Sequence, residues 1–241
     1  MLFRSAPPPP QPSPIKGEGE SFASCWLLHP GKPAWCNVTQ GTHEIVLASG
    51  SRARRERLAA AGVPFTVQAA DVDEPAIRAR MHKADPGVDP KKVAAVLAAA
   101  KAEDVSGKIA GSLIIGADQV LALGDELLSK APNTEAARAA LRKLRGRTHE
   151  LHSAVAFAEK GKVTWAHVAT ARLTMRDFSD AFIEDYLTRA GDRVSQTVGA
   201  YELEGLGVQL FDKIEGDYFT VLGLPLLPVL AELRARRIIA T

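Results

Sequence analysis

From residue 44 onward, short apolar runs alternate with longer segments in which apolar residues recur every three or four positions. Runs of the first kind are typical of buried strands, and segments of the second kind are typical of amphipathic helices. Strands are therefore expected over residues 44–49, 64–70 and 206–217, and over 112–118, which ends in a polar tip and is continued by 119–123. A hairpin is expected over 148–175, with its turn at Gly161-Lys162. Helices are expected over residues 51–62, 90–105, 133–146, 179–191 and 224–238. This alternation predicts an α/β fold built on a mixed central sheet with flanking helices.

The expected helix boundaries carry capping residues. Asn133 and Ser179 stand immediately before two of the helices, where their side chains can accept a hydrogen bond from the first turn. Gly62 and Gly146 stand where two helices should end, because glycine readily adopts the left-handed conformation of a helix terminus. The residues 71–75, DVDEP, are expected to form an acidic loop after the second strand.

The first part of the chain has a different composition. Residues 1–42 are rich in Pro, Gly, Ser and Glu, and such a segment buries too little apolar surface to offset the entropy of ordering. We interpret it as disordered or as a wrongly assigned leader, so that the folded domain spans residues 43–241. The alternative is a tail that binds a proline-recognising partner in the polyproline II conformation.

Composition argues against several classes of protein. The net charge of +2 is too small to indicate nucleic-acid binding, and no apolar run is long enough to span a membrane. The two cysteines, Cys25 and Cys36, both precede the expected domain, so no disulfide framework is predicted within it. An apolar secretory signal is also missing, and a cytoplasmic location is the expectation.

The junction between the first strand and the first helix suits an anion. Ser49 and the small residues after it leave backbone N–H groups free at a helix start, where the helix dipole favours negative charge. Arg54 and Arg55, with two further arginines, crowd the first helical turns, and cations there are unfavourable unless an anion lies between them. A solvated basic helix face is the alternative interpretation.

Carboxylates and lysines occur where a core would not need them. Asp73 and Glu74 are expected to end a strand, and Asp118 follows the apolar run LIIGA, which we interpret as a strand's carboxyl end, where α/β sheets place ligands. Lys101 lies in an Ala-rich helix and Lys130 in a loop. Carboxylates hold Mg²⁺ or Mn²⁺, and lysines neutralise phosphate oxygens. Each residue alone also fits a surface charge, but together they favour polyphosphate chemistry.

Seven ordered blocks of the chain resemble the Maf-like proteins. They are IVLASGSRARRERL (45–58), DVDE (71–74), AAAKA (98–102), LIIGADQV (113–120), SK (129–130), GRTHELHSAVA (146–156) and GAYELEGLGVQLFDKIEGDYFTVLGLPLLPVL (199–230). The resemblance implies an α/β fold with a deep cleft, related to the inosine-triphosphate pyrophosphatases, and a homodimer. It also implies Mg²⁺- or Mn²⁺-dependent hydrolysis of a nucleoside triphosphate to the monophosphate and pyrophosphate.

Roles follow by position from this resemblance. Ser49, Arg54 and Arg55 would contact the phosphates, and Glu74 and Asp118 would hold the metal. Asp118 would also be the base that activates water. Lys101 and Lys130 would stabilise charge that develops on the phosphates.

The chain departs from the family pattern at two places. Members usually read LASxSPRR, whereas Arg52 here replaces the proline and Ala53 replaces the first of the consecutive arginines. The usual GKP is Ser129-Lys130-Ala131 here, with the proline displaced by one position. These departures predict redistributed phosphate contacts at the first helix and a differently shaped loop around Lys130.

One block bears on the base of the nucleotide. Glu204 stands where members acting on dTTP and UTP carry Gln, and Gln119 also resembles the branch of 7-methyl-GTP pyrophosphatases. A carboxylate accepts two hydrogen bonds from adjacent guanine N–H groups, whereas an amide suits uracil or thymine. Tyr201 keeps the pyrimidine-type GAY pattern, so dTTP or UTP remains the alternative. Glu204 could instead pair with a surface arginine.

Two rival functions remain. Maf-like proteins have been associated with septum formation, so a non-catalytic regulator is one alternative, although a binding protein has no need of the combined carboxylates and lysines. Nucleic-acid binding through residues 52–57 is the other, and it predicts steep salt dependence.

Overall fold

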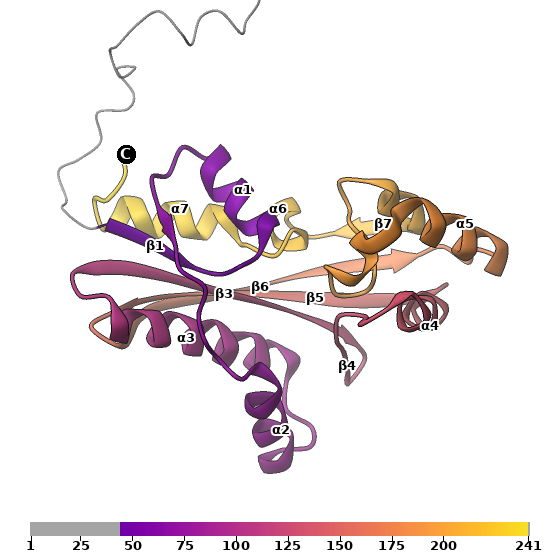
Figure 1. Ribbon diagram of the computed structural model, residues 1–241, viewed down its shortest axis with the longest axis horizontal. Coiled ribbons are helices and arrows are strands. Elements are labelled where there is room, and N and C mark those ends of the chain that lie inside the picture. The colour runs from indigo at the N-terminus through magenta and orange to yellow at the C-terminus, as the bar shows by residue number, and fades with distance from the viewer. Residues whose placement is uncertain (1–43, 241) are drawn as a thin grey trace, which may run out of the picture. The chain divides into compact units, whose positions relative to one another are not determined.

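A computed structural model describes residues 44–240, which form a seven-stranded sheet covered by helices (Figure 1). The strands lie in the order β2 (Thr66–Val67), β1 (Glu44–Ala48), β3 (Ser112–Leu123), β5 (Thr148–Glu159), β6 (Lys162–Met175) and β7 (Phe211–Glu215), and β4 (Glu126–Leu128) pairs with β3. β1 is parallel to both of its neighbours, and the other pairings are antiparallel. The predicted mixed α/β sheet is confirmed.

Side-chain alternation along β1 and β3 separates two layers of core. Ile45 and Leu47 pack with α1 (Arg52–Ala60) and α7 (Leu226–Ala235), whereas Val46 and Ala48 pack with α3 (Pro90–Lys108). Figure 1 shows α1 and α7 on one side of the sheet and α3 on the other. Successive residues of a strand therefore reach opposite faces, as strand geometry requires.

A third core lies where the long hairpin of β5 and β6 extends beyond the first strands. There α4 (Thr134–Leu144), α5 (Asp180–Ala190) and the 3-10 helix η3 (Gly191–Ser195) cover the sheet. Asn133 and Ser179 cap α4 and α5 as predicted, and each side chain accepts a hydrogen bond from the backbone N–H three residues later. Gly62 and Gly146 have φ values of 73° and 67°, the left-handed conformation expected of them.

The close contact between α3 and β3 depends on Gly116. A Cβ atom at this position would lie 2.3 Å from the carbonyl oxygen of Ala98 and 2.6 Å from the backbone nitrogen of Ala102. Only a residue without a side chain lets the helix backbone approach the strand so closely. Because Lys101 stands between these two alanines in the helix sequence, this contact fixes its distance from β3.

Three expected elements differ in the structure. Residues 71–75 are not a loop throughout, because α2 (Glu74–Ala84) begins at Glu74 with Asp73 as its N-cap and Pro75 in its first turn. The second strand is reduced to β2, whose two residues are both exposed and so offer little apolar surface to a longer pairing. α2 buries no residue fully, which is why its apolar periodicity was too weak to predict a helix.

The expected strand over 206–217 is also wrong in its first half. Residues Leu206–Leu210 form the 3-10 helix η4, and only β7 is extended. Gly207 lies so close to the backbone of Glu202 that a Cβ atom there would be 2.5 Å from the Glu202 carbonyl oxygen, and this contact holds the chain in a compact turn. The short helix α6 (Tyr218–Val221) then precedes α7.

The expectations for residues 1–42, with both cysteines, lie outside the described residues. Within the described part of the chain, the helices are too short or too polar to cross a membrane.

Candidate functional site

The sheet has a gap in its strand pairing beside β1. The pairing of β1 with β3 ends at Ala48 and Gly116, and the pairing of β4 with β3 begins only at Leu121. Residues 117–120 of β3 therefore pair with β5 on one side and with neither β1 nor β4 on the other. We call this interval the β3 gap.

Asp118 lies inside the β3 gap, in the middle of a twelve-residue strand. The expectation that it ends a strand is wrong, because β3 continues to Leu123. It does lie just beyond the carboxyl end of β1, where the parallel pairing stops. The predicted position at the carboxyl end of a parallel strand thus applies to β1, and not to the strand that carries Asp118.

Lys101 joins the two predicted metal-binding carboxylates. Its Nζ atom lies 2.7 Å from Oδ1 of Asp118 and 2.7 Å from Oε1 of Glu74. The Asp118 side chain is 6% exposed and the Lys101 side chain 13%, so the pair is largely removed from water. Two ions in such surroundings interact strongly, and neither is stable there without the other.

Arg78 is a further cation in this cluster, and the sequence analysis missed it. It lies one turn after Glu74 on α2, and its Nη2 atom is 3.5 Å from Oδ2 of Asp118 and 3.9 Å from Oε2 of Glu74. No hydrogen bond reaches Oδ2 from the residues that the structure describes, although the atom is buried. The i to i+4 spacing from Glu74 would have indicated Arg78 if α2 had been recognised as a helix.

The charges around Glu74 affect its ionisation. Partial burial by itself would raise the pKa of this carboxyl, but the hydrogen bond and charge of Lys101, with the charges of Arg78 and Arg54, hold the pKa below its usual value. Glu74 is therefore ionised at neutral pH, as a metal ligand must be.

Arg54 is buried on the opposite side of the β3 gap. Its Nε donates to the carbonyl oxygen of Gly223 at 2.7 Å, and Nη1 donates to the Ala117 carbonyl at 2.9 Å and to Ser49 Oγ at 3.1 Å. Burial lowers the pKa of this guanidinium, against the charges of Asp118 and Glu74, which favour the charged form. Arg54 and Ser49 thus tie α1, β3 and the segment before α7 together at the site.

Two other predicted phosphate ligands are exposed. Arg55 is exposed on α1, and Lys130 is exposed after β4, where its backbone bridges to Val198. Arg52 is also turned to solvent and pairs with Glu56 one turn later. The structure therefore brings Glu74, Lys101 and Asp118 into direct contact, places Ser49 and Arg54 beside them, and leaves Arg55 and Lys130 at the surface.

Gln119 faces the other side of the sheet from Asp118. Its amide nitrogen donates to Ser153 Oγ at 3.0 Å and to the carbonyl oxygens of Thr220 and Val221 at 3.2 and 3.0 Å. Ser153 Oγ also donates to the Thr220 carbonyl, at 2.7 Å. These hydrogen bonds anchor α6 to the sheet next to the site.

Glu204 is held by two side chains from distant parts of the chain. Its Oε1 accepts a hydrogen bond from Nη1 of Arg57 at 3.0 Å and from the hydroxyl of Tyr218 at 2.6 Å. Hydrogen bonding to this carboxylate raises the pKa of Tyr218. The pairing with a surface arginine is thus observed, while the side chain keeps 38% of its surface exposed.

The donor set at the β3 gap fits a hard divalent cation. Glu74 and Asp118 supply carboxylate oxygens, and the buried Oδ2 atom of Asp118 accepts no hydrogen bond from the described residues. Mg²⁺ is commonly held by one or two carboxylates together with substrate phosphates and water. Within residues 44–240, no three His, Cys, Asp or Glu side chains gather as a metal cage, so the remaining ligands would have to come from phosphate and water.

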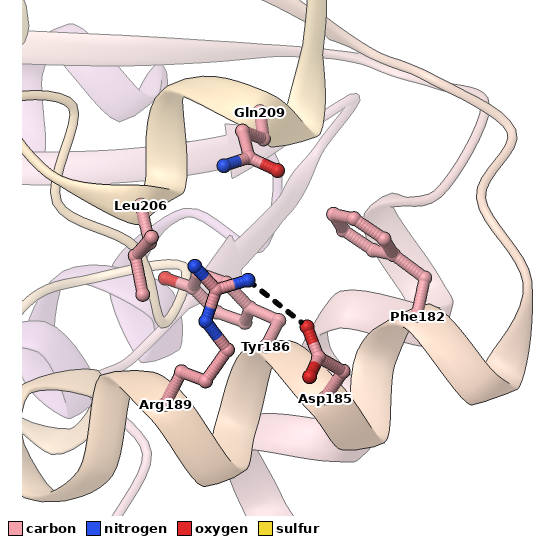
Figure 2. A pocket seen from close by; sticks show the side chains of 6 residues that line it. All are labelled: Phe182, Asp185, Tyr186, Arg189, Leu206 and Gln209. Atoms are coloured by element: carbon pink, nitrogen blue, oxygen red, sulfur yellow. Dashed lines mark hydrogen bonds and ion pairs between the residues drawn. The ribbon is translucent and has the colours of Figure 1, made fainter.

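A small surface pocket lies elsewhere, between α5 and η4 (Figure 2). Phe182, Tyr186 and Leu206 give it apolar walls, and an ion pair between Asp185 and Arg189 lies at its rim. No residue of this pocket belongs to the predicted site.

A mixed α/β sheet with paired carboxylates, a buried lysine and arginine, and small residues at a strand-to-helix junction has the groups that an enzyme acting on phosphates requires. The profile of the family "Maf-like protein" matches residues 44–236, and the chain belongs to this family.

Similar proteins cover the same region. The chain is 50% identical over 198 residues to a protein named 7-methyl-GTP pyrophosphatase from Brucella abortus. The aligned region covers 82% of this chain and 98% of that protein. The chain is 51% identical over 193 residues to a protein of the same name from Mesorhizobium japonicum, covering 80% and 96%. It is 49% identical over 201 residues to a protein named nucleoside triphosphate pyrophosphatase from Bradyrhizobium diazoefficiens, covering 83% and 98%.

Proposed function

We propose that this protein hydrolyses a nucleoside triphosphate to the nucleoside monophosphate and pyrophosphate, with 7-methyl-GTP as its preferred substrate. The observation that carries the proposal is the bridge from Lys101 to both Glu74 and Asp118 at the end of the parallel strands. Membership of the Maf-like family and the names of the similar proteins support it.

The chemistry would be a single displacement at phosphorus. A water molecule attacks a phosphorus atom of the anhydride between the α- and β-phosphates, and the bond from that phosphorus to the bridging oxygen breaks. The proton of the water passes to the carboxylate of Asp118, which Lys101 holds in place by a 2.7 Å hydrogen bond. The proton then leaves to solvent when pyrophosphate departs.

Cations of the site would stabilise the charge of the polyphosphate. Lys101 lies next to the proton acceptor, and Arg54 and Ser49 lie on the other side of the β3 gap. Arg55 and Lys130, both exposed, would reach the outer phosphates once the nucleotide is bound. Fixed positive charges aimed at the reacting group are usually the largest contribution to catalysis of this kind.

Glu74 and Asp118 would hold a divalent cation, Mg²⁺ or Mn²⁺. When bound, the ion would offset the charge of the phosphate oxygens and orient them for attack.

Glu204 is the candidate for base recognition. Arg57 and Tyr218 both bind Oε1, so Oε2 is the oxygen left to accept from a guanine N–H group. The positive charge that N7-methylation adds to guanine favours a nearby carboxylate further. We expect Glu204→Gln to lower the rate on 7-methyl-GTP relative to UTP and dTTP, with Glu202→Gln as the matched control. Equal relative rates in both variants and the unmodified protein would remove Glu204 from base recognition.

Pyrophosphate release from a nucleotide panel tests the whole proposal. The panel contains 7-methyl-GTP, GTP, UTP, dTTP and CTP, with Mg²⁺, with Mn²⁺ and with EDTA. We expect metal-dependent release that is fastest with 7-methyl-GTP and that Asp118→Asn abolishes. Asp125→Asn, in the exposed turn before β4, is the control and should leave the rate unchanged.

The other outcomes are equally informative. Faster release from dTTP or UTP would keep the enzyme class and replace the substrate. No release from any nucleotide by a folded protein would overturn the proposed activity and favour the non-catalytic regulator.

A further inference from the structure

We infer that Arg78 makes metal binding at the β3 gap depend on the nucleotide, by neutralising the metal-binding carboxylates while no nucleotide is present. This inference rests on the proposed function, because it takes Glu74 and Asp118 as the metal ligands. It assigns a role to a residue that neither the sequence pattern nor the resemblance singled out.

Arg78 faces both of the predicted metal-binding carboxylates. Glu74 and Arg78 lie one helical turn apart on α2, and the guanidinium of Arg78 lies within 4 Å of both carboxylates. Lys101 already binds Oε1 of Glu74 and Oδ1 of Asp118. The remaining oxygens, Oε2 of Glu74 and Oδ2 of Asp118, are the ones that Arg78 faces. A divalent cation would need these same oxygens.

Arg78 contacts Asp118 at a longer distance than Lys101 does. The distance of 3.5 Å to Oδ2 of Asp118 is an ion-pair distance, and Oδ2 accepts no hydrogen bond within the described part of the chain. Lys101, in contrast, binds Oδ1 at the 2.7 Å of a short charge-assisted hydrogen bond. The Arg78 side chain also retains 24% of its surface exposed, so it has solvent to move into. Arg78 is therefore the exchangeable cation of the cluster, and Lys101 is the fixed one.

The cluster around Asp118 contains more cations than carboxylates. Three cations, Lys101, Arg78 and Arg54, act on two carboxylates, Glu74 and Asp118. A free divalent cation would enter a cluster that is already positive. A nucleotide triphosphate brings several negative charges with the metal and gives the guanidinium of Arg78 phosphate oxygens to bind instead. The metal and the nucleotide should therefore bind with positive coupling, and such coupling is reciprocal.

Mn²⁺ binding measured by electron paramagnetic resonance tests this without catalysis. The protein is titrated with Mn²⁺ alone and then in the presence of an α,β-methylene nucleoside triphosphate, which cannot be cleaved at that bond. We expect the analogue to strengthen Mn²⁺ binding to the unmodified protein. In Arg78→Gln we expect Mn²⁺ alone to bind at least about tenfold more tightly, because one nearby positive charge is removed, and the coupling to the analogue to shrink.

Two variants serve as controls. Arg78→Lys keeps the charge and should bind Mn²⁺ as the unmodified protein does. Arg80→Gln removes an exposed charge from the same helix and should also leave Mn²⁺ binding unchanged. A thermal unfolding scan of each variant reports whether the domain is intact.

Two results would overturn the inference. One is equal Mn²⁺ affinity in the unmodified protein and Arg78→Gln. The other is an analogue that fails to strengthen Mn²⁺ binding to the unmodified protein, a measurement that needs no variant. Failure of the proposed activity would appear separately, as a lack of pyrophosphate release from a protein that still binds Mn²⁺.

Discussion

The ammonium group of Lys101 lies 2.7 Å from the carboxylate of Asp118, although one residue belongs to a helix and the other to the central strand beneath it. Both side chains are mostly buried, so this contact fixes the orientation of the Asp118 carboxylate.

Replacing Lys101 should damage both stability and activity. In Lys101→Met the Asp118 carboxylate keeps its burial but loses its short hydrogen bond, and breaking such a pair costs about 3 kcal/mol. We expect a matching fall in the free energy of unfolding in urea and loss of pyrophosphate release. The double variant Lys101→Met/Asp118→Asn should recover part of the stability and none of the activity. Lys108→Met, at an exposed ion pair of the same helix, should change neither.

Gly116→Ala tests the close approach of α3 to β3. The new Cβ atom would overlap the backbone of Ala98 and Ala102, so the helix must shift. We expect a loss of about 2–3 kcal/mol in the free energy of unfolding and a large loss of activity, because Lys101 moves with the helix. Gly107→Ala is the control within α3, where a Cβ atom meets nothing within 4 Å. That variant should gain about 0.5–1 kcal/mol and keep its activity, and equal behaviour of the two variants would contradict the packing argument.

Arg54 and Arg55 are neighbours with different expected roles. Arg54→Met leaves the carbonyl oxygens of Ala117 and Gly223 without their donor, and we expect the free energy of unfolding to fall by about 3 kcal/mol. Arg55→Met removes an exposed side chain and should leave stability unchanged while it raises KM for the nucleotide. Urea unfolding and steady-state kinetics of both variants separate the two roles. An unstable Arg55→Met protein would contradict this division.

His149 should make stability depend on pH. Its ring is buried, Nε2 lies 2.7 Å from the hydroxyl of Tyr201, and burial lowers the pKa of His149 from 6.5 to about 4. The imidazole of His149 therefore binds a proton near pH 6.5 in the unfolded chain, but only near pH 4 in the folded chain. Stability from this residue is complete above pH 6.5 and is lost as the pH falls towards 4, by about 3 kcal/mol in total.

Urea unfolding at pH 7.5 and pH 5 checks this prediction. The unmodified protein should lose more stability between these values than His149→Gln, whose side chain does not titrate. The acidic groups common to both proteins cancel in this comparison. An equal loss in the two proteins would show that folding does not lower the pKa of His149.

Local sequence patterns were sufficient for much of the fold. The hairpin of β5 and β6, the caps of α4 and α5, and the mixed sheet all follow from apolar periodicity and capping residues. α2 could not be predicted in the same way, because a helix that buries no residue fully has little apolar periodicity to show. Arg78 was missed for this reason, since its place beside Asp118 depends on α2 being helical.

The candidate site depended more on packing between distant segments. Asp118 and Gln119 are adjacent in sequence and face opposite sides of the sheet, which strand alternation predicts once β3 is known to continue through them. The pairing of Arg57 with Glu204, 147 positions apart, could be named only as an alternative, because no local pattern joins these residues. The sequence named most of the chemical groups of the candidate site, and tertiary packing determined which of them touch.

Hydrogen exchange of the backbone amides in the β3 gap should report whether a nucleotide is bound there. Backbone amides of residues 117–120 that point away from β5 have no neighbouring strand to protect them, whereas the flanking parts of β3 are paired on both sides. In D₂O these few amides should exchange faster than the rest of the strand, and a bound nucleotide that fills the gap should slow them. Mass spectrometry of peptides from this strand would then follow ligand arrival at the backbone itself, in an unmodified protein and without any turnover.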